Sequence, residues 1–263
     1  MNSSSRHTPL PDGPFTAEQI AAFNDQGYVL VRGLFGPEQM QDIRAWTDEV
    51  QDWPETAGQH MMYFEESRSG GRQRILNRVE NVLPYHDGFR RLATGSSMQG
   101  ACGQLFGKPA VLFKDKINFK LPGGGGFEPH QDVQAGWARY ASIHITALIT
   151  IDPATRENGC LEIAADFHEH RLIGREWEPL TDADLHGVRF VPMESEPGDA
   201  VFFDSFIPHQ SGPNHTNQSR RVLYYTYNKA SEGDHLARYY ADKRASYPPD
   251  IEREPDKEYH YRV

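Results

Sequence analysis

The hydrophobic pattern predicts helices in the N-terminal part of the chain. Thr16 and Gln19 form a capping box for a helix that ends before Gly27. Apolar residues at three- and four-residue steps predict a second helix over residues 36–51. A third helix is expected over residues 89–106, packed under a sheet.

The remaining pattern is typical of a sheet protein. Short apolar or alternating runs, separated by turn residues, predict strands. These runs occur near residues 28–31, 110–120, 128–134, 143–151, 160–164, 188–192, 200–203 and 221–228. The polar, glycine-rich residues 54–72 are expected to form an irregular flap. The pattern therefore predicts a mainly β fold with flanking helices, a double-stranded β-helix or jelly-roll barrel like that of cupins.

Length and composition agree with one domain. A chain of 263 residues can bury a full core, and we expect a disordered N-terminus over residues 1–14 and a single domain over residues 15–263. A net charge of −10 argues against nucleic acid or an anionic membrane surface as partner. Cys102 and Cys160 are expected to be reduced thiols of a cytoplasmic protein. The oligomeric state is not predicted.

A possible metal site begins at His130-Gln131-Asp132 and is completed by His209. In an extended strand, residues i and i+2 project from the same face, so His130 and Asp132 can reach one ion. Two imidazoles and one carboxylate, with no nearby cysteine, suit a partly open divalent site such as that of non-haem Fe(II) oxygenases. The same donors also bind Mn²⁺, Co²⁺ or Ni²⁺.

The surroundings of these residues strengthen this interpretation. The glycine-rich residues 121–127 are expected to form a loop that leads into the first histidine. Pro197-Gly198-Asp199 predicts a tight turn before a buried strand, after which the chain reaches His209. Arg220 and Arg221 then open another predicted strand, and they point to opposite faces of it.

These features together resemble the phytanoyl-CoA dioxygenase (PhyH) family of Fe(II)- and 2-oxoglutarate-dependent oxygenases. The resemblance covers most of the chain, and its motifs lie at residues 23–35, 130–132, 158–161, 197–199 and 209–220. It implies three iron ligands that also form the catalytic centre, namely His130, Asp132 and His209. Three protein ligands leave two positions for 2-oxoglutarate and one for O₂. Related halogenating enzymes replace the carboxylate with a small residue, so Asp132 favours hydroxylation.

The resemblance also implies a site for the co-substrate. Arg220 would bind the distal carboxylate of 2-oxoglutarate through two parallel hydrogen bonds, with Arg221 as the alternative. Ser211 would assist, and Asn118 is a further predicted contact. Because polar and apolar residues alternate over residues 116–120, one face of that strand faces either the site or the solvent.

The C-terminal residues and the glycine run look like one branch of the family. That branch hydroxylates 2-aminoethylphosphonate, or its trimethylammonium analogue, at the carbon next to phosphorus, in organophosphonate catabolism. A phosphonate needs arginine and amide donors, and a quaternary ammonium needs aromatic faces. The predicted substrate contacts are Tyr63, Asn77, Arg78, Asn81 and Trp137.

Other functions stay open from the sequence. A PhyH-family enzyme could instead hydroxylate an ectoine-like compound or an acyl-thioester. A cupin-type module could hold a metal without turnover, but such structural metal sites are more often closed by four protein ligands. A purely structural site also has no need for the nearby Arg220.

Overall fold

The helices near the N-terminus form where the sequence predicts them. The computed structural model describes residues 13–70, 73–167 and 169–259, so most of the expected N-terminal tail lies outside the described residues. Thr16 caps α1 (Ala17–Gln26) through the predicted capping box, and Gly27 ends it with a φ of 75°. After β1 (Tyr28–Val31), Pro37 opens α2 (Pro37–Gln51).

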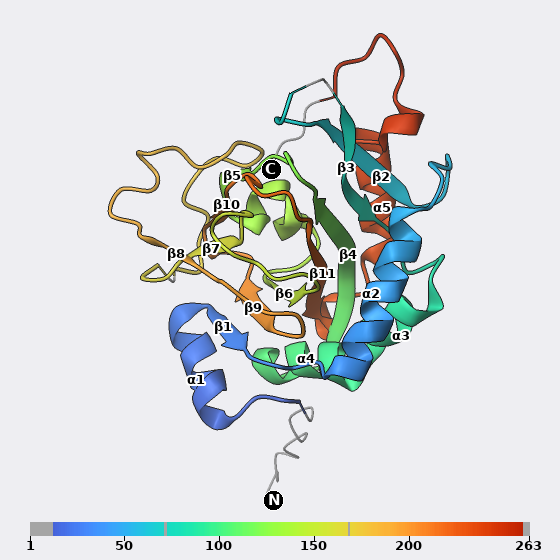
Figure 1. Cartoon of the computed structure of the whole chain (residues 1–263). Coiled ribbons are helices and arrows are strands. Elements are labelled where there is room, and N and C mark those ends of the chain that lie inside the picture. Colours follow the sequence, from blue (N-terminus) through green and yellow to red (C-terminus); the bar gives the residue numbers. More distant parts are fainter. Residues whose placement is uncertain (1–12, 71–72, 168, 260–263) are drawn as a thin grey trace, which may run out of the picture.

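Two antiparallel sheets face each other beyond these helices (Figure 1). The larger sheet has the order β1-β9-β6-β11-β4-β3-β2, and its further strands are β9 (Ala200–Asp204), β6 (His144–Thr150), β11 (Arg220–Lys229), β4 (Ala110–Lys120), β3 (Arg74–Glu80) and β2 (Met61–Glu66). The smaller sheet has the order β5 (Phe127–His130), β10 (His209–Ser211), β7 (Leu161–Ala164) and β8 (Phe190–Pro192). This is the expected double-stranded β-helix with flanking helices.

The two faces of the large sheet have different neighbours. Its outer face packs against the helices in a core that includes Ile43, Phe89 and Phe119. Its inner face meets the small sheet in a second apolar core that includes Leu148 and Ile163. Both faces are covered, so the strands read as nearly continuous buried runs.

Two predicted segments differ from the structure. The prediction of an irregular flap over residues 54–72 is wrong in its middle, because residues Met61–Glu66 form β2, which pairs with β3 along its whole length. This strand was not predicted because glycines lie on both sides of it in the sequence. Its pairing with β3 stabilises it more than its own residue pattern does. The helix expected over residues 89–106 is interrupted at the extended residue Gly95 and consists of three pieces, which are α3 (Asp87–Thr94), a π-helical turn (Ser96–Gly100) and α4 (Ala101–Phe106).

The last α-helix among the described residues is α5 (Leu236–Ser246), which lies beside β2 and β3 (Figure 1). Short 3-10 turns complete the secondary structure at Asp132–Ala135, Trp137–Arg139, Ala230–Glu232 and Asp250–Glu252. Cys102 and Cys160 are both buried free thiols. Among the described residues, no helix is long and apolar enough to cross a membrane.

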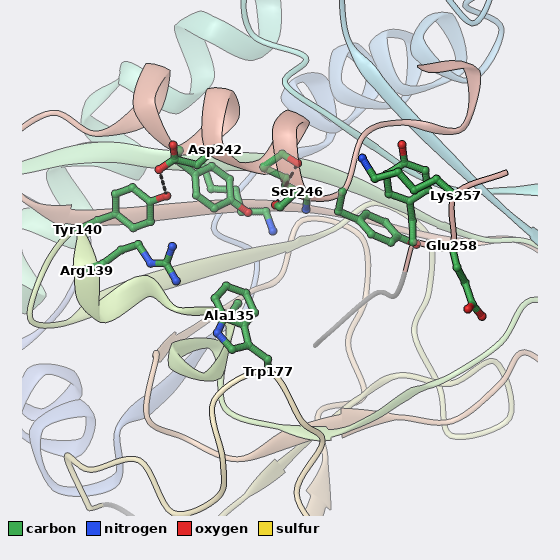
Figure 2. A pocket seen from close by; sticks show the side chains of 13 residues that line it. Ala135, Arg139, Tyr140, Trp177, Asp242, Ser246, Lys257 and Glu258 are labelled. Atoms are coloured by element: carbon green, nitrogen blue, oxygen red, sulfur yellow. Dashed lines mark hydrogen bonds between the residues drawn. The ribbon is translucent and has the colours of Figure 1, made fainter. Parts of the chain in front are cut away.

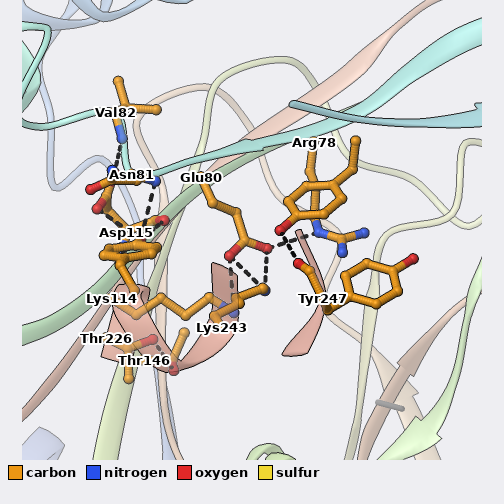
Figure 3. Close-up of polar contacts among 12 residues, drawn as sticks. Arg78, Glu80, Asn81, Val82, Lys114, Asp115, Thr146, Thr226, Lys243 and Tyr247 are labelled. Atoms are coloured by element: carbon orange, nitrogen blue, oxygen red, sulfur yellow. Dashed lines mark hydrogen bonds and ion pairs between the residues drawn. The ribbon is translucent and has the colours of Figure 1, made fainter. Parts of the chain in front are cut away.

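A buried cluster of charges joins α5 to the large sheet (Figure 3). The Glu80 carboxylate accepts hydrogen bonds from Lys243 Nζ at 2.6 and 2.8 Å and from Arg78 Nε at 2.8 Å. Lys114 Nζ lies 3.8 Å from the same carboxylate. Burial acts to raise the pKa of Glu80, but Lys114, Lys243 and Arg78 outweigh it and hold this pKa well below its usual range. One carboxylate thus supports three buried cations.

Replacing Glu80 with glutamine should destabilise the fold strongly, because three buried cations lose their counter-charge. We expect a loss of about 3–5 kcal/mol in the free energy of unfolding at pH 7, measured by urea denaturation. Because folding lowers the pKa of this carboxyl below its usual 4.5, its contribution is complete above that pH and is lost as the pH falls further. The deficit of Glu80→Gln should therefore shrink on acidification. The exposed Glu176→Gln is the control, and equal stability of the two variants would contradict the expectation.

Candidate metal centre and its cavities

The two histidines predicted from the sequence meet in the small sheet, where β5 pairs with β10. His130 ends β5 and His209 begins β10, and the two residues are direct cross-strand partners. Asp132 lies in the 3-10 turn that follows β5, so the strand predicted over residues 128–134 ends at His130. One ligand atom from each of these residues lies within 4.8 Å of the other two. The turn, rather than an extended strand, brings the carboxylate to the histidines.

Neighbouring groups orient each of the three side chains. His130 Nδ1 lies 2.7 Å from the carbonyl oxygen of Glu128, and His209 Nδ1 lies 3.0 Å from that of Ile207. Each Nδ1 therefore carries the proton, which leaves both Nε2 atoms as acceptors for a metal. Thr146 Oγ1 donates to Asp132 Oδ2 at 3.2 Å and fixes the carboxylate.

The protonation states also suit a cation. Burial, followed by the neighbouring His209, lowers the pKa of His130 to about 3. Burial acts to raise the pKa of Asp132, but His209 and Lys116 reverse the shift and lower it. At neutral pH this gives two neutral imidazoles and one carboxylate, the protonation states that metal ligation requires. The donor set fits a divalent transition metal.

Gln131, the residue between two of these donors, fixes the turn. Its side chain is fully buried, and its Nε2 donates to the carbonyl oxygens of Phe206 at 2.5 Å and Arg171 at 2.9 Å. Its Oε1 accepts from the Ile173 backbone N–H at 2.9 Å. Gln131 thereby ties the turn to two loops from elsewhere in the chain.

A row of polar side chains on β4 faces the inside of the barrel. Its members are Lys114, Lys116, Asn118 and Lys120. Their direct partners on β11 are, in the same order, Thr226, Tyr224, Val222 and Arg220. Burial, followed by Lys114, lowers the pKa of Lys116 to about 7. The sequence did not decide whether this face of residues 116–120 points to the site or to the solvent. In the structure it points to the inside of the barrel.

The two adjacent arginines occupy opposite faces of β11, as the alternation predicts. Arg220 is 2% exposed and points inward, and its Nε has no hydrogen-bond partner among the described residues. Arg221 points outward and forms ion pairs with Asp152 at 2.7 Å and with Asp48. Only Arg220 is available to a ligand inside the barrel.

Two adjoining cavities lie near the metal centre, and only the inner one is lined by its residues. The inner cavity, of about 40 Å³, is lined by the three metal-binding candidates together with Asn118, Trp137 and Ser211. The outer cavity, of about 420 Å³, shares Lys114 and Ala135 with it. Figure 2 shows the outer cavity between α5, the 3-10 turns after Asp132 and the C-terminal segment. Its other walls include Arg139, Tyr140, Trp177, Tyr239, Asp242, Lys243, Tyr247 and Tyr259.

Of the predicted substrate contacts, one lines the inner cavity, and the other four, Tyr63, Asn77, Arg78 and Asn81, do not line either of the two cavities. Trp137 lines the inner cavity, and its buried Nε1 has no hydrogen-bond partner among the described residues. Tyr63 packs on Tyr247 and donates to its carbonyl oxygen at 2.9 Å. Asn77 donates to Glu65 and accepts from Arg78. Asn81 lies at a φ of 57° beside Tyr240.

Several residues of the site were not selected from the sequence. Lys114 lines both cavities, and Thr146 and Gln131 hold the metal-binding candidates in place. The alternation of lysines on β4 was a usable signal, since a bulge at Phe113 changes the facing only before Lys114. Nothing in the local pattern links the outer-cavity residues of α5 to the metal centre.

Fold and site together define the class of the protein. A double-stranded β-helix that presents two histidines and one carboxylate, with open positions, is typical of non-haem iron oxygenases. The sequence model of phytanoyl-CoA dioxygenase (PhyH) matches residues 23–222, and the chain belongs to this family of dioxygenases.

Two curated relatives are similar over nearly their whole length. The chain is 41% identical over 246 residues to 2-aminoethylphosphonate dioxygenase of uncultured bacterium HF130_AEPn_1, covering 93% of this chain and 94% of the relative. It is 40% identical over 233 residues to methylphosphonate hydroxylase of Gimesia maris, covering 88% of each chain.

Solved structures show the same fold at lower identity. EctD from S. alaskensis, solved with 2-oxoglutarate and 5-hydroxyectoine, has a TM-score of 0.71 at 19% identity and covers 84% of this chain and 78% of its own. The epimerase SnoN from nogalamycin biosynthesis has a TM-score of 0.65 at 21% identity and covers 81% and 82%.

Proposed function

We propose that this protein is an Fe(II)- and 2-oxoglutarate-dependent hydroxylase of a small phosphonate. The best-supported reaction is hydroxylation at C1 of 2-aminoethylphosphonate or of its N-trimethyl analogue. The observation that carries the proposal is the pair of lysines on β4 that line the inner cavity beside the metal centre, Lys114 and Lys116, of which Lys114 also lines the outer cavity. Lys114 shares the single carboxylate of Glu80 with Arg78 and Lys243, so the positive charge of this cluster is only partly balanced. Such excess positive charge favours anionic ligands. The names of the two similar relatives add independent support.

Three residues would hold the iron, namely His130, Asp132 and His209. When bound, Fe(II) with O₂ and 2-oxoglutarate supplies the oxidising power, so that the substrate C–H becomes C–OH while 2-oxoglutarate becomes succinate and CO₂. Thr146 and the carbonyls of Glu128 and Ile207 keep these three ligands in position. The protein thus contributes orientation and deprotonated donors.

Arg220, Ser211 and Asn118 would position the co-substrate. The guanidinium of Arg220 is buried on the inner face, where two parallel hydrogen bonds can hold a distal carboxylate. Ser211 and Asn118 line the inner cavity, and the buried Nε–H of Arg220 is a donor without a hydrogen-bond partner among the described residues. Such unsatisfied polar atoms are expected where a ligand completes the site.

The substrate would lie toward the outer cavity. Lys114 and Lys116 supply positive charge beside the metal centre, and the Nε1 of Trp137 supplies a further donor to a phosphonate oxygen. The ammonium end then reaches the wall that contains Tyr140 and Tyr239, whose ring faces suit a cation. A cavity of about 420 Å³ gives space for this amine-bearing chain.

The alternatives fit these features less well. An acyl-thioester needs a long apolar wall, whereas basic groups and tyrosines line much of the outer cavity. A binding module without turnover does not explain a buried arginine with an unsatisfied Nε on the inner face of the barrel. An ectoine-like substrate lacks the second negative charge that the lysines of β4 would balance.

Metal binding should depend on the three donors and on Thr146. His130→Ala should abolish tight binding of Fe(II) or Co(II), measured anaerobically by titration calorimetry. Thr146→Val keeps the side-chain shape but loses the hydrogen bond to Asp132, and it should weaken binding by roughly 10–100-fold. His186→Ala, an exposed histidine, serves as the control. Wild-type affinity in His130→Ala would exclude the assigned centre.

Substitution of the two adjacent arginines should have different effects, on co-substrate binding for Arg220 and on stability for Arg221. Arg220→Ala should raise the KM for 2-oxoglutarate by at least roughly 100-fold while metal affinity is unchanged, because a bidentate charged contact is lost. Arg221→Ala should mainly lower the melting temperature, because this residue only pairs with Asp152 and Asp48 on the outside. The reverse result would move the anchor to Arg221.

The function itself is tested by succinate formation with Fe(II), ascorbate and a panel of aminophosphonates, methylphosphonate, betaines and acyl-thioesters. Stimulation by an aminophosphonate, with a 1-hydroxy product seen by phosphorus NMR, is the expected result. Lys114→Met should raise the substrate KM by roughly 10–100-fold and leave the KM for 2-oxoglutarate nearly unchanged. Exposed Lys108→Met is its control. Stimulation only by a non-phosphonate would reject the substrate class.

A further inference from the structure

Two buried cations face each other at the inner end of the barrel. Lys120 and Arg220 are direct cross-strand partners and are 3% and 2% exposed. Like charges directly opposite on a sheet destabilise it, and burial increases the cost. Among the described residues, no carboxylate forms an ion pair with either side chain. Burial, followed by Arg220, lowers the pKa of Lys120 to about 6. The protein without a ligand therefore disfavours the charged form of this lysine.

All three N–H groups of Lys120 have acceptors. Its Nζ lies 2.8 Å from Ser211 Oγ, 3.2 Å from the carbonyl oxygen of Gly159 and 2.5 Å from that of Gly212. A carboxylate beside it would favour the charged form of Lys120. An ammonium can only donate, so in that form the Ser211 hydroxyl accepts from Nζ and must direct its own proton elsewhere. Because Ser211 lines the inner cavity, its proton is available to an acceptor there.

The backbone around Lys120 is built for this close approach. A Cβ on Gly159 would lie 2.1 Å from the carbonyl oxygen of Gly212 and 2.9 Å from Lys120 Nζ. Gly159 also has a φ of 75°, which side chains rarely adopt. Lys120 therefore joins the end of β4 to the loop before β7 and to the end of β10. Its position is fixed on three sides.

We propose that Lys120 is a positioning residue for the co-substrate, which orients the Ser211 hydroxyl as a donor and adds a second positive charge beside Arg220 at the distal carboxylate. This inference rests on the proposed function, because it takes the ligand to be 2-oxoglutarate. Lys120 does not touch the carboxylate, since its three donors are already used. Its contribution acts through Ser211 and through the electrostatic potential.

The role of Lys120 can be tested with small ligands that each keep only one end of 2-oxoglutarate. Calorimetry with Ni(II)-loaded protein would measure the Kd of 2-oxoglutarate, of succinate, which keeps the distal carboxylate, and of oxalate, which keeps only the chelating end. Lys120→Met should weaken 2-oxoglutarate and succinate by roughly 10–100-fold and oxalate by less than about threefold. Ser211→Ala should reproduce part of the loss, and the double variant should lose less than the product of the two single effects.

The controls separate positioning from folding. Exposed Lys108→Met should leave all three Kd values unchanged. Thermal unfolding monitors stability, and Lys120→Gln, which keeps a donor without the charge, replaces Lys120→Met if that variant does not fold. Equal weakening of oxalate, unchanged 2-oxoglutarate affinity or strict additivity with Ser211→Ala would overturn the inference. If the wild-type protein binds no 2-oxoglutarate, the proposed function itself fails, and that result is distinct.

Discussion

The burial of a row of basic side chains on β4 is the constraint to which the rest of the structure is adjusted. Lys114, Lys116 and Lys120 all face the inside of the barrel, whose core between the two sheets includes an apolar cluster. Removing such charges from water costs several kcal/mol each unless a counter-charge is close. At one end Glu80 supplies a single negative charge that Lys114 shares with Arg78 and Lys243, and in the middle Asp132 balances Lys116 in part. At the other end no carboxylate of the described chain pairs with Lys120 or Arg220.

This uneven distribution of counter-charges connects the fold to its chemistry. A core built only for stability would pair each cation or replace it with an apolar residue. Here the fold retains positive charge on both sides of the metal centre, where the proposed phosphonate and 2-oxoglutarate would bring negative charge. The net charge of −10 says nothing about this, because the acidic residues that dominate it lie mostly on the surface.

The sequence predicted the fold and the metal-binding candidates because their signals are local. The capping box at Thr16, the apolar strands and the His130-Gln131-Asp132 run can all be read within a few residues. β2 and the facing of the lysines on β4 were less predictable. β2 depends on its pairing with β3, and the facing depends on which side of the sheet meets the second sheet. The outer cavity needs α5 beside the 3-10 turns after Asp132, a contact between segments far apart in sequence.

The types of cation along the barrel also differ in a way that matches two different anions. The planar guanidinium of Arg220 presents two parallel donors, which match the two oxygens of a planar carboxylate. Lys114 and Lys116 are compact point charges with no preferred plane, which suits the three oxygens of a tetrahedral phosphonate. An exchange of the two ligands would leave a planar carboxylate between ammonium groups and a tetrahedral anion on the guanidinium. The order of side chains along β4 and β11 therefore agrees with the proposed arrangement, in which each anion would have its own end of the site.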